Sequence, residues 1–88
     1  MNLAELNQRV DGIFVSLFEL ERSQLSGDKN LFSDLGLDSL DTIDLVISFH
    51  KEFGIKPPND ELQHIQTLSD VYTLVAKYHR NREQVLDH

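Results

Sequence analysis

The stretch DLGLDSLD, residues 34–41, leads from an acidic loop into an amphipathic segment. Gly36 lets the backbone turn at little steric cost. Asp38 is a residue type favoured at helix starts, and Asp41 follows three positions later, where a carboxylate interacts favourably with the helix dipole. We therefore expect a helix to begin at Asp38 or Ser39, with Ser39 exposed in its first turn.

The predicted helix ends near Phe53, because Gly54 favours a C-terminal break and Pro57-Pro58 cannot continue the helix. Its apolar residues form two stripes at helical spacing. The first, assigned to the core, is Leu45, Val46, Phe49 and Phe53, and the second is Leu40, Ile43 and Ile47. Both cannot be equally buried in a small bundle, so we expect the second to be partly exposed. Burial of the second stripe as ordinary core is an open alternative.

Three further helices are expected around this one. Residues 2–21 carry an apolar stripe of Leu3, Leu6, Val10, Ile13, Leu17 and Leu20, widened by Phe14 and Phe18. A long connection covers residues 24–33, a short helix covers 59–64, and a last helix runs from Thr67 to about residue 82, with Asp70 at the reciprocal capping position. Its stripe is Leu68, Val71, Leu74 or Tyr72, Val75 and Tyr78. No segment shows the alternation of apolar and polar residues that is typical of a strand, so the predicted fold class is all-α. The prediction is a four-helix bundle with a long first loop and a short third helix.

Size and composition limit the possible functions. The 88 residues suit one small domain, which we place at residues 1–80, followed by a polar tail at 81–88. Cysteine is absent, which excludes disulfides and thiolate chemistry by the chain itself. A net charge of −7 argues against nucleic acid and for basic protein partners. The sequence shows no secretory signal and no membrane span, so we expect a cytoplasmic protein.

The segment from Leu31 to Asp44 resembles the acyl carrier protein family. The resemblance covers roughly residues 3–78 and includes the run LGLDSLDT at 35–42 and the Glu52-Phe53-Gly54 helix ending. It implies an acyl-carrier-like bundle in which Ser39 receives 4'-phosphopantetheine from coenzyme A. A phosphopantetheinyl transferase performs that attachment in the family, and the thiol of the arm then carries acyl groups as thioesters. The resemblance therefore implies a carrier rather than an enzyme.

The second stripe then becomes a candidate docking face for the transferase and for acyl-loading and acyl-processing enzymes with basic surfaces. This predicted face consists of Asp38, Leu40, Asp41, Ile43, Asp44 and Ile47. The resemblance also implies a cavity that shelters an acyl chain, for which the candidate lining residues are Leu45, Val46, Phe49, Phe53 and Val71. We expect the carrier to be a monomer.

Two residues depart from the family pattern at the end of this helix. His50 and Lys51 stand where carboxylates are common, which indicates a specialised carrier rather than a housekeeping one. The run from Asp38 to Thr42 and the acidic balance favour an acyl carrier of fatty acid or polyketide type, and delivery to specialised lipid synthesis is included in this expectation. A peptidyl or D-alanyl carrier has the same arm chemistry and is an alternative, and an unmodified acidic helical adaptor is another. A hydrolase is not supported, because no histidine lies near Ser39 to act as a base. The four histidines show no metal-ligand spacing, so no metal site is expected.

Overall fold

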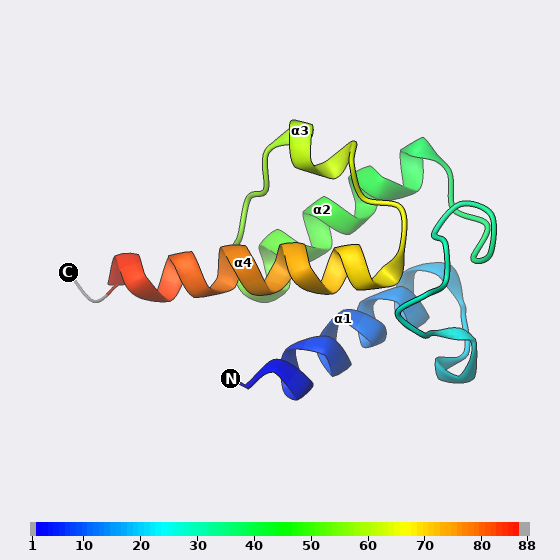
Figure 1. Cartoon of the computed structure of the whole chain (residues 1–88), viewed down its shortest axis with the longest axis horizontal. Coiled ribbons are helices and arrows are strands. Elements are labelled where there is room, and N and C mark those ends of the chain that lie inside the picture. Colours follow the sequence, from blue (N-terminus) through cyan, green and yellow to red (C-terminus); the bar gives the residue numbers. More distant parts are fainter. Residues whose placement is uncertain (1, 87–88) are drawn as a thin grey trace.

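The computed structural model describes residues 2–86. Four α-helices and one 3₁₀ turn follow one another in this range: α1 (Leu3–Phe18), η1 (Arg22–Gln24), α2 (Ser39–Phe53), α3 (Asn59–Leu62) and α4 (Leu68–Leu86). In Figure 1, α1 and α3 lie on opposite sides of α4, and the long loop before α2 closes one end of the bundle. The predicted all-α class, long first loop and short third helix are confirmed.

The first helix is shorter than predicted. The Asn2 side chain caps α1 by accepting a hydrogen bond from the Glu5 N–H, and the helix stops at Phe18 because Glu19 adopts a left-handed conformation with φ of 56°. The predicted stripe is correct in its middle and wrong towards its ends. Leu3 and Leu17 are 62% and 39% exposed, because the side of α1 that meets α2 and α4 is centred on other residues. The residues of α1 that are buried are Leu6, Val10 and Phe14.

The start of α4 is fixed by a reciprocal cap, as predicted. The Asp70 N–H donates to the Thr67 hydroxyl at 3.2 Å, and the Thr67 N–H donates to the Asp70 carboxylate at 3.1 Å. The helix continues to Leu86, four residues past its predicted end. Residues 87 and 88 of the predicted tail lie outside the described part of the chain, and the division at residue 80 stays a prediction.

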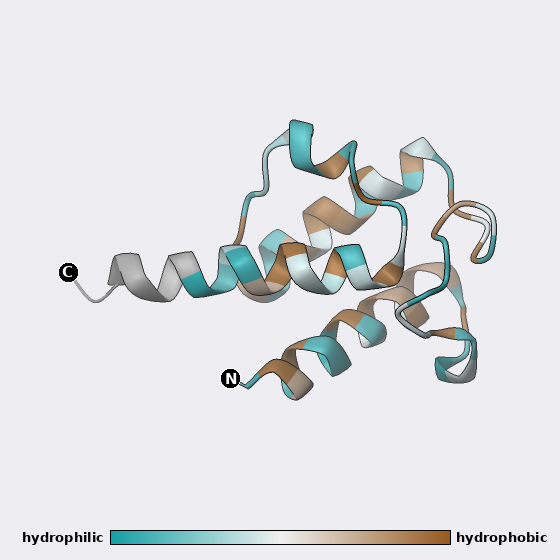
Figure 2. Cartoon of the chain, viewed as in Figure 1, coloured by the Kyte–Doolittle hydropathy of each residue, from teal (hydrophilic) through white to brown (hydrophobic). Residues whose placement is uncertain are grey.

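One continuous apolar core joins the helices, and hydrophobic residues recur along α1, α2 and the first half of α4 (Figure 2). A polar contact also joins α1 and α4, since the Tyr72 hydroxyl of α4 donates to the Asp11 carboxylate of α1. The loops contribute to the core as well as the helices. The buried apolar residues are Leu6, Val10, Phe14, Leu31, Leu37, Leu45, Phe49, Phe53, Ile55, Ile65, Leu68, Val71, Leu74 and Val75.

The helices between residues 2 and 86 are short or polar compared with membrane-spanning segments. None of them combines the length and the apolar composition needed to cross a bilayer.

Candidate functional site

The first turn of α2 is fixed by hydrogen bonds between Asp38 and Asp41. The Asp38 carboxylate accepts from the N–H groups of Leu40 and Asp41 at 2.9 and 3.1 Å, and the Asp41 carboxylate accepts from the Asp38 N–H at 2.9 Å. These bonds satisfy backbone donors that an uncapped helix end leaves free. The helix starts at Ser39 and ends at Phe53, with Gly54 left-handed at the C-terminus, so both predicted boundaries are confirmed.

Ser39 is exposed at this start, as predicted. The Thr42 hydroxyl donates to the Ser39 carbonyl at 2.6 Å, which leaves the Ser39 hydroxyl outside that bond. Within residues 2–86, no hydrogen bond joins the Ser39 Oγ to another protein group. The Ser39 hydroxyl is therefore exposed and is not held by a hydrogen bond to another described group.

The loop before α2 is rigidly tied to the rest of the fold. The Asn30 side chain accepts from the N–H groups of Phe32 and Ser33 at 2.9 and 3.0 Å, while the Leu31 N–H donates to the Gln66 carbonyl at 2.7 Å. Leu31 is completely buried, and Gly36 adopts a left-handed conformation with φ of 78°. These contacts fix the path of the backbone into α2, and they therefore fix the position of Ser39 at the start of the helix.

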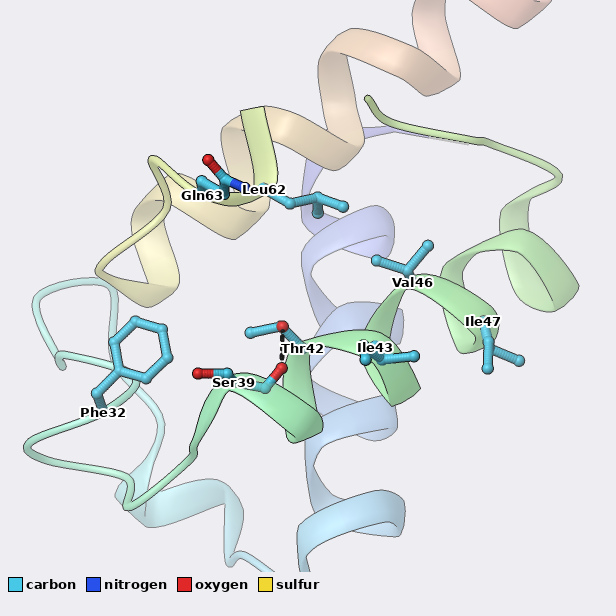
Figure 3. Close-up of a pocket in the computed structure, with 8 residues that line it drawn as sticks. All are labelled: Phe32, Ser39, Thr42, Ile43, Val46, Ile47, Leu62 and Gln63. Carbon is cyan, nitrogen blue, oxygen red and sulfur yellow. Dashed lines mark hydrogen bonds between the residues drawn. The ribbon is translucent and has the colours of Figure 1, made fainter. Parts of the chain in front are cut away.

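A groove of about 530 Å³ opens beside Ser39. Figure 3 shows Phe32 of the loop on one side of Ser39, with the α2 side chains and Leu62 extending away from it. The residues that line the groove are Phe32, Ser39, Thr42, Ile43, Val46, Ile47, Leu62 and Gln63. Most of these side chains are apolar, so the groove can accept a flexible chain with apolar segments.

No side chain that lines the groove can serve as a general base for Ser39. Its polar members are the hydroxyls of Ser39 and Thr42 and the amide of Gln63. A serine hydroxyl is a weak nucleophile without an adjacent base. Among the side chains that line the groove, none is therefore placed to remove the proton of the Ser39 hydroxyl.

The second stripe of α2 is exposed, as predicted. Leu40, Ile43 and Ile47 are 71%, 55% and 49% exposed, and the alternative that they are ordinary core residues is therefore wrong. Asp38 and Asp44 are exposed as well, whereas Asp41 is half-buried because its carboxylate takes part in the cap. The structure thus brings the six predicted docking residues together around the start and middle of α2.

The predicted acyl-cavity residues are divided between the groove and the core. Val46 lines the groove. The other four, Leu45, Phe49, Phe53 and Val71, are almost completely buried in the core. Their role in a cavity that opens around an acyl chain stays a prediction.

Sequence reasoning missed Phe32, Thr42, Leu62 and Gln63 as parts of this site. Phe32 carried a usable signal, since it is a large aromatic residue in the loop before α2, and the structure leaves it 40% exposed. Leu62 and Gln63 carried none, because they reach the groove only through the packing of α3 beside α2. His50 and Lys51 are both exposed near the other end of α2.

The chain is similar to known carrier proteins both in its sequence and in its structure. Residues 8–75 match the model of the phosphopantetheine attachment site family. An acyl carrier protein of Porphyromonas gingivalis is 33% identical over 85% of this chain and 96% of its own length. An acyl carrier protein of Amoebophilus asiaticus is 35% identical over 85% of this chain and 94% of its own length.

A solved structure supports the same relationship. It is described as "a putative acyl carrier protein" from Mycobacterium tuberculosis, and it superposes with a TM-score of 0.78 at 29% identity. The superposition covers 83% of this chain and 97% of the other.

Proposed function

This chain belongs to the acyl carrier protein family, and we propose that Ser39 is the residue to which its phosphopantetheine arm is attached. Carriers of this family hold 4'-phosphopantetheine and are substrates of other enzymes rather than catalysts. The observation that carries the proposal is the exposed, unbonded Ser39 hydroxyl at the mouth of an apolar groove.

The residues around Ser39 fit such an arm. The cap places Ser39 at the outer edge of the first turn, where a phosphodiester can extend into solvent without displacing a buried side chain. Beyond it the groove offers apolar walls to the flexible remainder of the arm. When bound, the arm supplies the thiol that the chain itself lacks, since the sequence contains no cysteine.

The exposed face of α2 supports docking by partner enzymes with basic surfaces. Its apolar residues give such a partner a small hydrophobic contact, and the neighbouring carboxylates attract Lys and Arg side chains. We propose that the transferase and the acyl-processing enzymes both use this face. Because the charges are exposed, this docking is weak and sensitive to salt.

The possible kinds of carrier differ in the group that the thiol of the arm holds. We propose an acyl carrier for fatty acid, polyketide or specialised lipid synthesis that acts as a monomer in the cytoplasm. A peptidyl or D-alanyl carrier differs only in what the thiol holds, and an unmodified acidic adaptor holds nothing.

The test is to purify the protein from cells that make it and to release its cargo with hydroxylamine. A fatty or polyketide acyl hydroxamate, identified by mass spectrometry, supports the proposal. An aminoacyl hydroxamate contradicts it in favour of the alternative carriers, and a chain found without an arm points to the adaptor.

A further inference from the structure

The helix α3 is too short to be stable by itself. It spans four residues, Asn59–Leu62, and isolated helices need roughly 12–15 residues to be even marginally stable in water. Its neighbours in the chain are anchored in the core, since Ile55 is 3% and Ile65 is 5% exposed. The turn between them therefore depends on side-chain contacts to keep its position.

One polar cluster provides such contacts to α4. The Glu61 carboxylate of α3 accepts a hydrogen bond from the Lys77 ammonium at 2.6 Å and a second from the Tyr78 hydroxyl. The Lys77 ammonium, and to a lesser extent the Tyr78 hydroxyl, holds the pKa of Glu61 below its usual range. Glu61 is therefore ionised near neutral pH, and both contacts are formed there. We call these three residues the α3 clasp.

The clasp lies next to the groove at Ser39. Leu62 and Gln63 directly follow Glu61, and both line the groove opposite the α2 side chains. Glu61 itself lies outside the groove, on the side that faces α4. A contact that fixes Glu61 therefore fixes the backbone that carries this wall of the groove.

We propose that Glu61 is a positioning residue that holds α3 against α4 and thereby keeps Leu62 and Gln63 in place as a wall of the Ser39 groove. The consequence for the carrier rests on the proposed function: a fixed wall shelters the arm and its thioester, and a loosened wall exposes them to water and to attacking reagents. The wall itself can be tested without any arm.

The test compares Glu61→Gln with Glu52→Gln in the unmodified full chain. Glu52 is the matched control, because it forms a similar ion pair with Arg9 at 2.9 Å that joins α2 to α1 away from the groove. The readout is amide hydrogen exchange at Leu62 and His64, whose N–H groups bond to the carbonyls of Pro58 and Glu61. We expect exchange at these amides to rise about fivefold in Glu61→Gln, the size expected for losing a partly exposed ion pair.

Tyr78→Phe is the second variant, since it keeps the Lys77 contact and removes only the hydroxyl. We expect a smaller rise at the same two amides. Unchanged exchange at Leu62 and His64 in Glu61→Gln would overturn the proposal. An equal rise throughout the chain, or an equal rise in Glu52→Gln, would also overturn it, because either result means a general loss of stability.

A second readout uses the octanoyl thioester of the arm-bearing protein. We expect hydroxylamine to cleave this thioester about twice as fast in Glu61→Gln as in the unchanged protein or in Glu52→Gln. Faster amide exchange with an unchanged cleavage rate would show that the clasp does not shelter the cargo. If Ser39 accepts no arm at all, the proposed function fails, while the amide exchange still decides whether Glu61 holds the wall.

Discussion

Replacing Phe49 with Ala tests which face of α2 belongs to the core. The Phe49 side chain is completely buried, and its ring lies 6.3 Å from the Phe53 ring, measured between centroids. Removing such a ring leaves a cavity and costs about 3–5 kcal/mol. A chain of 88 residues is expected to have a total stability of roughly 4–13 kcal/mol, so the variant loses a large part of it.

The assay is urea unfolding followed by circular dichroism, with Ile47→Ala as the matched control. Ile47 lies two residues away on the same helix and is 49% exposed, so its truncation is expected to cost less than about 1 kcal/mol. If Phe49→Ala does not fold, Phe49→Leu keeps the test open, with an expected loss of about 1–2 kcal/mol. Equal losses for the Phe49 and Ile47 variants would refute the assignment of the two faces.

Three further predictions concern the loop, the α4 cap and the docking face. Gly36→Ala is expected to cost about 1–2 kcal/mol in urea unfolding, because φ of 78° is unfavourable for a side chain. In the described part of the chain, no atom beyond Gly36 and its two chain neighbours lies within 4 Å of the added Cβ, so a clearly larger loss would contradict this cause. Bonds from two backbone N–H groups lower the pKa of Asp70, so its carboxylate stabilises the fold above its ordinary pKa, and this stabilisation is lost as pH falls through the lowered value. Asp70→Asn is therefore expected to flatten the fall in unfolding free energy below about pH 4, and an unchanged acid profile would contradict this cause. Asp44→Lys is expected to raise the KM of arm attachment by about five- to tenfold at low salt and by less at high salt, and a KM that does not change would argue against docking at this face.

The boundaries of α2 were predictable because they depend on local signals. Asp38 and Asp41 cap its start through bonds within three residues, and Gly54 ends it by adopting a left-handed conformation. The buried face of α1 was less predictable, since apolar residues surround much of that helix. Only the packing against α2 and α4 decides that Phe14 is buried while Leu17 is 39% exposed.

The candidate site also combines features that the sequence predicts with features that only the folded structure shows. Ser39 and the exposed stripe of α2 could be predicted, because a helix start and a helical period are short-range patterns. The groove could not, because Phe32 and Leu62 come from segments thirty residues apart in the chain, and only tertiary packing brings both to the groove beside α2. The contact of Glu61 with α4 is hidden for the same reason, since Lys77 lies sixteen residues further along.

The most direct measurement of the central claim locates the arm on the chain. The purified protein is incubated with coenzyme A, magnesium and a phosphopantetheinyl transferase of broad specificity, and the modified residue is identified by fragmentation mass spectrometry. Ser33 is the matched control, since it is another exposed serine of the same region. We expect one arm on the unchanged protein and on Ser33→Ala, and none on a folded Ser39→Ala. An arm on Ser39→Ala, or an unmodified natural chain, would contradict the account.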